Sequence, residues 1–382
     1  MAVVQISRIQ VRRGQKNVGA GLPQLSSGEL GWAIDSRELY IGNGSVAEGS
    51  PAVGNTKILT QYDDIFSLAD TYTYRVADGY LQTGSSSASP IQRTLQARLD
   101  DIVSIKSFGL TGIASDDATA GLQRAVDQLF LNSATKANES SKVVLYLEPG
   151  IYSITSTIHI PPQANIIGAG PRKTIIRNSG AGAIFDTVTS SSTPGAPNYA
   201  PTSVTQSKNL RIENLTLDTT ATNKGIDLQS CANSYFYNID VTGAWTQSDS
   251  LVDANIGIQM SSLSGSIETK NNTFQNVRVT GFSYAVESVW DINNNIFDKC
   301  SFDTLGYGIT FGKGMTLGGS GKLTGPSKNN ISNSTFNKVN KQAIYIEQGE
   351  YNHSQSNKFT SCGNEAGTEG QPQTSVIKFN KN

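Results

Sequence analysis

Acidic residues at regular spacing are the first candidates for chemistry in this 382-residue chain. Glycoside cleavage usually places two carboxyl groups about 5 to 9.5 Å apart across the sugar. Asp227 and Glu287 occupy equivalent positions in a short recurring segment, with Gln259 at the same position between them. Stacking of these segments would separate the two acids by about 9.6 Å. This distance fits only an inverting pair, and because no catalytic motif assigns a site, Asp227 and Glu287 remain candidates only.

Two tryptophans are candidates for sugar binding. Trp245 and Trp290 lie in or beside segments that interrupt the repeat, and loops on a rigid scaffold often carry binding surfaces. Their flat rings would serve as platforms for sugar stacking. Packing of the rings within the protein is the alternative.

The sequence predicts no metal site and no cofactor. His159 and His353 are the only histidines, and Cys231, Cys300 and Cys362 match neither a zinc spacing nor a disulfide framework. We see no acidic cluster with a nearby base of the kind that a calcium-dependent lyase would need. The odd number of cysteines suggests folding in a reducing cytoplasm.

A repeat between residues 209 and 379 must position all these side chains. Its first unit begins at six residues spaced by 24, 38, 23, 34 and 23 positions: Asn214, Asn238, Asn276, Lys299, Asn333 and Ser356. A second alternating unit follows each first unit. Two apolar columns result: Leu217, Val241, Val279, Phe302, Phe336, Phe359; and Ile226, Ile258, Val286, Ile309, Ile344, Ile377. One strand set per 20 to 50 residues predicts a solenoid, here an all-β, right-handed parallel β-helix.

The same alignment predicts several local contacts. Asparagine tolerates left-handed backbone and can stack in amide ladders, so the recurring asparagines are interpreted as a turn ladder. Asp240 would face Arg278 on the next rung as a surface ion pair. Cys300 falls in an inward column and is expected in the core.

Three segments are expected along the chain. Residues 1–60 form a small β module with a hairpin around Asp35 and a core of Trp32, Ile34, Leu39 and Ile41. Residues 61–101 form a connector that ends in a short helical neck. Residues 102–382 form the β-helix.

The neck is predicted as a helix over residues 91–102. Leu95, Leu99 and Ile102 would form one apolar stripe, and three such helices packed together would make a trimer. Packing of a single helix on the solenoid is the alternative. A second helix is predicted over residues 118–131, with Asp116 and Asp117 as its capping residues rather than a catalytic pair.

The sequence resembles two families. Arg-Arg-Gly at 12–14, Gly-Glu-Leu-Gly-Trp at 28–32 and Leu-Tyr-Ile-Gly-Asn-Gly at 39–44 resemble the N-terminal module of phage tail fibres and receptor-binding proteins. That resemblance implies a trimeric tail protein with a non-catalytic module near the virion. Val-Ser-Ile-Lys-Ser-Phe-Gly at 103–109 and Ser-Asp-Asp-Ala-Thr-Ala-Gly-Leu-Gln-Arg-Ala at 115–125 resemble the start of pectate-lyase-like β-helix domains, which occur in lyases, hydrolases and inert fibre parts. This resemblance implies that the helix over 118–131 caps the N-terminal end of the solenoid.

The composition argues against several kinds of binding partner and location. A net charge of −1 argues against nucleic-acid binding. The sequence contains no run of 18 apolar residues, so it predicts no membrane span. The first residues lack the apolar core of a signal peptide, which argues against a free secreted lyase.

We therefore expect a structural phage tail component, a fibre, tailspike or baseplate-associated protein assembled in the host cytoplasm and carried in the virion. Its partners would be copies of itself as a homotrimer, other tail or baseplate proteins and a host surface glycan. The small number of rungs and the end of the sequence after a strand unit favour a linking or accessory part. The alternative is a tailspike depolymerase that cleaves host polysaccharide.

Overall fold

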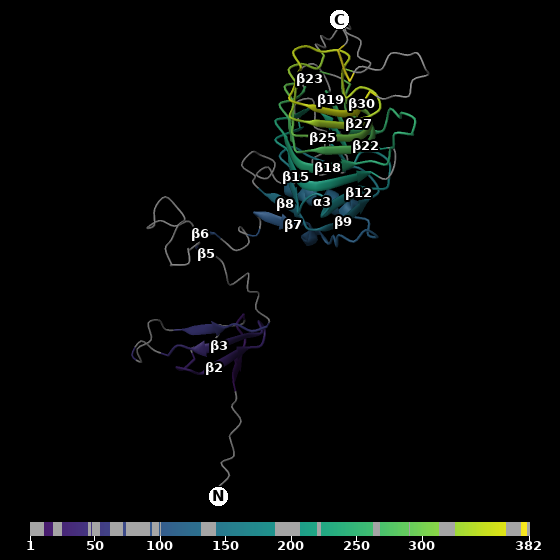
Figure 1. Ribbon diagram of the computed structural model, residues 1–382. Helices are drawn as coiled ribbons and strands as arrows, with labels where there is room; N and C mark the ends of the chain where they lie inside the picture. The colour runs from purple at the N-terminus through teal and green to yellow at the C-terminus, as the bar shows by residue number, and fades with distance from the viewer. Residues whose placement is uncertain are drawn as a thin grey trace, which may run out of the picture. The chain divides into compact units, whose positions relative to one another are not determined.

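The computed structural model describes residues 11–17, 25–44, 47, 54–61, 72–73, 92–93, 99, 101–130, 143–187, 207–219, 223–262, 268–289, 291–312, 325–363 and 376–379. The chain divides into two compact units, residues 1–99 and 100–382 (Figure 1). No helix among the described residues is long and apolar enough to cross a membrane.

The N-terminal unit contains a four-stranded sheet in the order β1-β2-β3-β4. Its strands are β1 (Arg12–Gly14), β2 (Leu30–Ala33), β3 (Glu38–Gly42) and β4 (Asn55–Ile58). The antiparallel β2–β3 hairpin turns at Asp35 and Ser36, as the sequence predicts.

The predicted core of this sheet is wrong. The buried apolar residues are Leu25, Ala33 and Tyr40, whereas Ile34 is 55% exposed. Strand alternation places Trp32, Leu39 and Ile41 on the opposite face from Tyr40, where they are only partly buried.

The predicted helix over 91–102 is also wrong at both ends. Gln92–Arg93 form strand β6, which pairs with β5 (Tyr72–Thr73), and Ile102 starts strand β7 (Ile102–Ser104). Ile102 pairs with Val144 of the β-helix, so its backbone hydrogen bonds go to a sheet. Leu99 is 48% exposed, and Leu95 lies outside the described residues.

The second unit is a right-handed parallel β-helix whose rungs stack from α3 towards the C-terminus (Figure 1). Register divides its strands among three faces. Face 1 contains β7, β8 (Val144–Leu147), β11 (Asn165–Gly168), the first parts of β15 (Arg211–Thr219) and β18 (Tyr235–Thr242), β21 (Thr273–Gln275), β24 (Ile296–Asp298), β26 (Asn330–Ser332) and β29 (His353–Gln355).

Face 2 contains β9 (Gly150–Ile154), β12 (Thr174–Asn178), the later parts of β15 and β18, the first parts of β22 (Arg278–Ser288) and β25 (Ser301–Phe311), β27 (Thr335–Val339) and β30 (Lys358–Cys362). Face 3 contains β10 (Ile158–His159), β13 (Phe185–Asp186), β16 (Ile226–Gln229), β19 (Ile256–Ser261), the later parts of β22 and β25, β28 (Ile344–Ile346) and β31 (Ile377–Phe379). A short parallel sheet of β14 (Ser207–Lys208), β17 (Cys231–Ala232), β20 (Thr269–Lys270) and β23 (Ile292–Asn293) completes the rungs.

Both predicted apolar columns are in register and line one continuous core. Cys300 lies in that core with 2% exposure, and burial raises the pKa of its thiol to about 12. Helix α3 (Thr119–Phe130) contacts β8, β10 and the 3-10 helix η2 (Ile105–Phe108) at the first rungs through its buried face. Asp117 accepts hydrogen bonds from the Thr119 amide and hydroxyl, which confirms its predicted capping role.

Asparagine ladders hold the corners between faces. Asn238 donates to Asn214 at 2.7 Å and Asn276 to Asn238 at 2.9 Å, and all three residues have positive φ, as the turn ladder predicts. A second ladder, not predicted, is buried except at Asn352, which is partly exposed. It links Asn272, Asn295, Asn329 and Asn352 by side-chain hydrogen bonds of 2.9 to 3.0 Å.

Candidate functional site

A line of polar side chains runs along face 3, and we call it the polar column: His159, Asp186, Asp227, Gln259 and Glu287. Each residue is paired in register with the next on the adjacent rung. The predicted order of Asp227, Gln259 and Glu287 is thus in place. The column also extends two rungs towards α3, to Asp186 and His159.

The extension changes which acids are neighbours. Asp186 and Asp227 lie on adjacent rungs, which stack about 4.8 Å apart, whereas Asp227 and Glu287 are separated by Gln259. Glu287 is 5% exposed, so its carboxyl is largely closed off from solvent. The adjacent pair is therefore the better arrangement for two carboxyl groups that act on one sugar.

The two neighbouring aspartates have different surroundings. Burial raises the pKa of Asp186, and the nearby Asp227 charge acts in the same direction, while a 2.7 Å hydrogen bond with His159 Nδ1 opposes them. Asp227 forms a 2.7 Å ion pair with Lys224 and is 20% exposed at its side chain. A carboxyl that is easier to protonate thus lies next to one that is paired with a cation, a division seen in acid and base partners.

The first rungs provide space beside the column. A cavity of about 560 Å³ lies between α3 and the start of face 3, and His159, Gln123 and Asp117 are among the residues that line it. Gln123 holds the His159 backbone through two hydrogen bonds, from its Nε2 to the carbonyl and from the His159 amide to its Oε1. The His159 end of the column is therefore fixed in place beside an open space.

Trp245 is not a surface platform. Its side chain is 6% exposed, and its Nε1 donates to the Ser250 carbonyl at 3.1 Å. The packing alternative describes it, because the side chain is buried within the protein. Trp290 lies outside the described residues.

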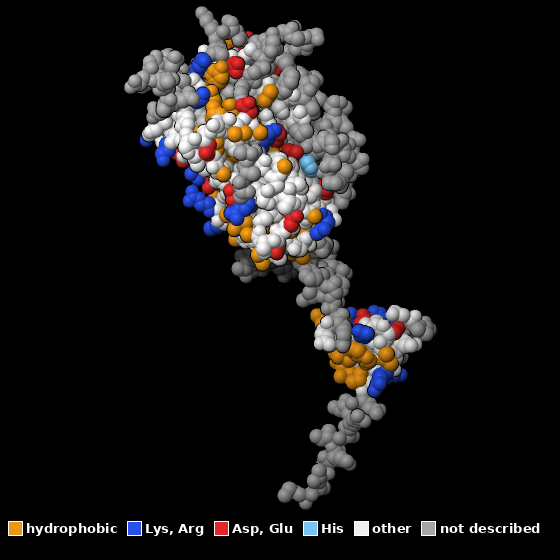
Figure 2. Space-filling view, turned by 90° about the vertical axis from the view of Figure 1, so that its right-hand side faces the viewer, with side chains coloured by type: hydrophobic (Ala, Val, Ile, Leu, Met, Phe, Trp, Pro, Cys, Tyr) orange, Lys and Arg blue, Asp and Glu red, His pale blue; other side chains and the backbone are white. Residues whose placement is uncertain are grey.

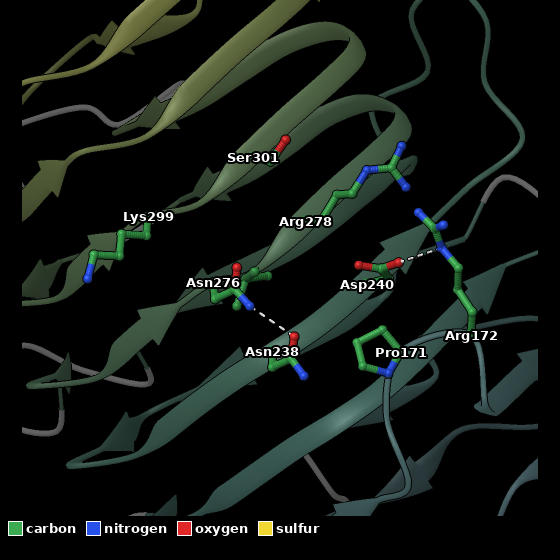
Figure 3. A pocket seen from close by; sticks show the side chains of 9 residues that line it. Pro171, Arg172, Asn238, Asp240, Asn276, Arg278, Lys299 and Ser301 are labelled. Atoms are coloured by element: carbon green, nitrogen blue, oxygen red, sulfur yellow. Dashed lines mark hydrogen bonds and ion pairs between the residues drawn. The ribbon is translucent and has the colours of Figure 1, made fainter.

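A second hollow lies at the corner between faces 1 and 2 (Figure 3). It measures about 350 Å³, and Arg172, Asp240, Arg278 and Lys299 are among its lining residues. Asp240 faces Arg278 on the next rung, as predicted, but the ion pairs of these two side chains are formed with other residues. Asp240 lies 3.4 Å from Arg172, and Arg278 lies 4.0 Å from Asp303, because the turn at Arg172 reaches over the outward side of face 2.

Among the described residues, no three acidic, histidine or cysteine side chains cluster as a metal site would require. Sequence reasoning missed Asp186, His159 and Arg172. The signal for the first two was a repeated pair of an apolar residue followed by a polar one, at 158–159, 185–186 and 226–227. A pattern of two residues is too short to be distinguished from a chance occurrence unless the pairing of the strands is known.

Comparison with known proteins gives a family match for most of the chain. The profile of the family described as Rhamnogalacturonase A/epimerase, pectate lyase-like matches residues 102–369. A Glucan 1,3-beta-glucosidase from Cochliobolus carbonum is 33% identical over 92 residues, which are 24% of this chain and 10% of that protein.

Solved structures share the fold. The Geobacillus virus E2 protein ORF18 matches with a TM-score of 0.52 and 16% identity, over 88% of this chain and 60% of that one. The tailspike protein 3 of bacteriophage CBA120 matches with a TM-score of 0.45 and 14% identity, over 88% of this chain and 59% of that one. The fold thus resembles that of ORF18 of Geobacillus virus E2, and this chain spans about 60% of the length of these two structures.

Proposed function

The chain belongs to the rhamnogalacturonase A/epimerase, pectate lyase-like family, and from this premise we propose that it is a phage tail protein that holds a host surface polysaccharide along face 3. The observation that carries the proposal is the polar column. It aligns imidazole, carboxylate and amide groups on consecutive rungs. Such groups donate to and accept from sugar hydroxyls, and ionised groups form the stronger hydrogen bonds.

The test is binding of bacterial surface polysaccharides. The full chain would be applied to an array of capsular and lipopolysaccharide O-chain glycans. A Gln259→Ala, Asp227→Ala variant should lose about tenfold or more of the affinity for any glycan that the wild type binds, because two hydrogen-bonding groups are removed.

Thr335→Ala supplies the matched control, because Thr335 is exposed on face 2, away from the column. It should leave binding unchanged. Equal affinity of the wild type and the column variant would remove face 3 from the function.

Cleavage of the same polysaccharide is the second candidate function, and the adjacent Asp186 and Asp227 favour it. Asp186 in its protonated form would donate its proton to the glycosidic oxygen, while Asp227 attacks the anomeric carbon or activates water. One water is consumed and two sugar ends are released. Carboxyl groups about 5 to 5.5 Å apart are typical of retaining enzymes.

One assay distinguishes binding of the polysaccharide from its cleavage. New reducing ends would be measured after incubation with the bound glycan, for the wild type, Asp186→Asn and Asp227→Asn. Release by the wild type that falls at least about 100-fold in both variants supports cleavage. Retained binding without release leaves adhesion as the function.

The N-terminal unit would attach the protein to the tail. Leu30, Trp32, Leu39, Ile41 and Ile58 share one side of its sheet and are only partly buried. Figure 2 shows hydrophobic side chains gathered on this unit. Exposed apolar patches mark interaction sites, and we assign this one to homotrimer formation and docking on tail or baseplate proteins in the virion.

Light scattering of the full chain tests the trimer. The wild type should have three times the mass of one chain, and Leu39→Asp with Ile41→Asp should reduce it, because both side chains belong to the partly exposed apolar side of the sheet. A monomeric wild type would contradict self-association in solution.

A further inference from the structure

A hollow at the corner of faces 1 and 2 is separate from the polar column. Arg172, Arg278 and Lys299 contribute positive charge to its lining, and Asp240 is the single carboxylate among the described residues that line it. The hollow follows the rungs of Asp240, Arg278 and Ser301, which are adjacent in register. Two rung spacings cover about 9.6 Å, enough for one or two sugar residues.

The turn that carries Arg172 is built rigidly. Arg172 has a φ of 64°, a left-handed conformation that is sterically unfavourable for a residue with a Cβ atom. Its amide donates to Thr216 Oγ1 at 2.8 Å, and the Gly170 amide donates to the Asn214 carbonyl at 2.8 Å. These bonds to the next rung hold Arg172 over face 2, although glycine or asparagine would suit the backbone better.

The guanidinium groups of Arg172 and Arg278 point towards one another above Asp240 (Figure 3). Their contacts to carboxylates, 3.4 Å from Arg172 to Asp240 and 4.0 Å from Arg278 to Asp303, exceed ordinary hydrogen-bond lengths. Arg177 instead bonds Asp218 at 2.8 Å on the same face, and Arg211 bonds Glu213 at 2.7 Å on face 1. The arginines of the hollow are therefore under-neutralised compared with their neighbours.

We propose that this hollow binds an acidic sugar residue, with Arg172 and Arg278 on either side of its anionic group. An anion placed between two positive charges that face each other attracts both and offsets their mutual repulsion. Planar guanidinium groups bind carboxylate and phosphate oxygens in pairs. Asn276, Lys299 and Ser301 line the same hollow and would contact the remaining oxygens of the sugar.

The source of such a sugar rests on the proposed function, because a tail protein meets acidic glycans at the host surface. Its anionic group is either a carboxylate, as in a uronic acid, or a phosphate, as in a phosphate-linked polymer. The chemistry at the arginines is the same for both.

Calorimetric titration of the full chain tests the site with three probes: trigalacturonate, a short poly(glycerol phosphate) and neutral maltotriose. We expect one or both anionic probes to bind, maltotriose not to bind, and affinity to fall with added salt. Preference between the anionic probes identifies carboxylate or phosphate as the group.

Arg172→Gln and Arg278→Gln should each weaken that binding about tenfold or more. Arg177→Gln removes the same charge from face 2 at a closed ion pair and should leave affinity nearly unchanged. Both arginines of the hollow have exposed or partly exposed side chains, and circular dichroism would verify that each variant folds.

Failure of both anionic probes to bind would overturn the inference. Equal losses from Arg177→Gln and Arg172→Gln would overturn it too, because they would indicate a general charge effect. The Gln259→Ala, Asp227→Ala variant should bind the anionic probe normally. If the full chain binds the anionic probe but no glycan that depends on face 3, the proposed function fails and the hollow stands. If it binds such a glycan but no anionic probe, the inference about the hollow fails and the proposed function stands.

Discussion

The β-helix and the N-terminal sheet bury apolar surface by different means. In the β-helix, each rung covers the next, and like residues stack in one continuous core that also encloses a ladder of asparagines. The N-terminal sheet buries only Leu25, Ala33 and Tyr40 on one side. An ion-pair cluster around Glu38 occupies that side, while the apolar residues of the other side stay partly exposed.

The difference shows what repetition contributes. In the ladder of Asn272, Asn295, Asn329 and Asn352, stacking of the rungs pairs each amide with the next one, so these polar groups are enclosed without being left unpaired. A single small sheet has no such neighbours. Among the described residues of this unit, the buried carboxylate of Glu38 is satisfied by Lys16 and Lys57, and the apolar residues on the other side of the sheet stay partly exposed.

The largest effect is expected in the aromatic stack of the β-helix. Phe274 lies between Phe236 and Phe297 with ring centroids 4.7 Å apart on both sides, and it is 0% exposed. Phe274→Ala should lower the free energy of unfolding of the β-helix by about 3 to 5 kcal/mol, since it removes contacts to two rungs and leaves a cavity. Urea unfolding of the full chain would measure it.

Ile296→Ala is the control for this stack, because Ile296 is 36% exposed on the same face. It should cost less than about 1 kcal/mol. A cost for Phe274→Ala as small as that of Ile296→Ala would show that stacking between rungs does not stabilise the solenoid.

The buried asparagine ladder should give the next effect. Asn295 accepts from the Asn272 amide and side chain at 3.1 and 2.9 Å, and it donates to the Thr269 carbonyl and Asn329 at 3.2 and 3.0 Å. Asn295→Ala leaves several buried groups unpaired, and we expect a loss of about 3 kcal/mol in urea unfolding. A loss below about 1 kcal/mol would mean that water or rearrangement replaces the ladder.

The sequence predicts the β-helix well because its signal is local and repeated. Leu217, Val241 and Val279 reveal their column through spacing alone, and the structure pairs them in that order. The turn asparagines are predictable for the same reason, since a left-handed corner recurs on each rung. The register of Asp227 with Gln259 follows directly.

The remaining site residues depend on contacts that spacing does not encode. Asp186 lies in a two-residue strand outside the clear repeat, and its neighbour Asp227 is known only once that strand is stacked. Arg172 meets Asp240 because a turn folds over the next rungs, 68 positions away in sequence. Trp245 falls in an insertion of the predicted kind, but its burial depends on how that loop closes.

A smaller effect, dependent on pH, should appear in the N-terminal sheet. Burial alone would raise the pKa of Glu38, but hydrogen bonds from Lys16, Lys57 and Tyr40 outweigh it and hold the pKa far below its ordinary value of 4.5. The stabilisation is therefore complete above pH 4.5 and is lost as pH falls towards the folded-state pKa. Glu38→Gln should cost about 2 kcal/mol at pH 7 and remove most of this dependence.

Hydrogen exchange of β3, corrected for intrinsic pH effects, measures this change between pH 3 and 7. The β-helix serves as an internal reference in the same sample, because Glu38 lies in the other unit. Protection of β3 that is independent of pH in the wild type would contradict the assigned role of the cluster.

The smallest effect should come from the exposed ladder of Asn233, Asn271 and Asn294, which uses the same amide bonds as the buried one, at 3.0 and 2.9 Å. Asn271 has a φ of 56°. Asn271→Gly keeps that conformation and loses only solvent-exposed hydrogen bonds, so about 0.5 kcal/mol is expected. Asn271→Ala adds left-handed strain and should cost about 1 to 2 kcal/mol.

Urea unfolding measures both variants. If the glycine variant loses as much free energy of unfolding as Asn295→Ala, burial is not the cause of the difference between the two ladders. If glycine and alanine cost the same, the corner asparagines are held by their amide bonds and not by their backbone conformation.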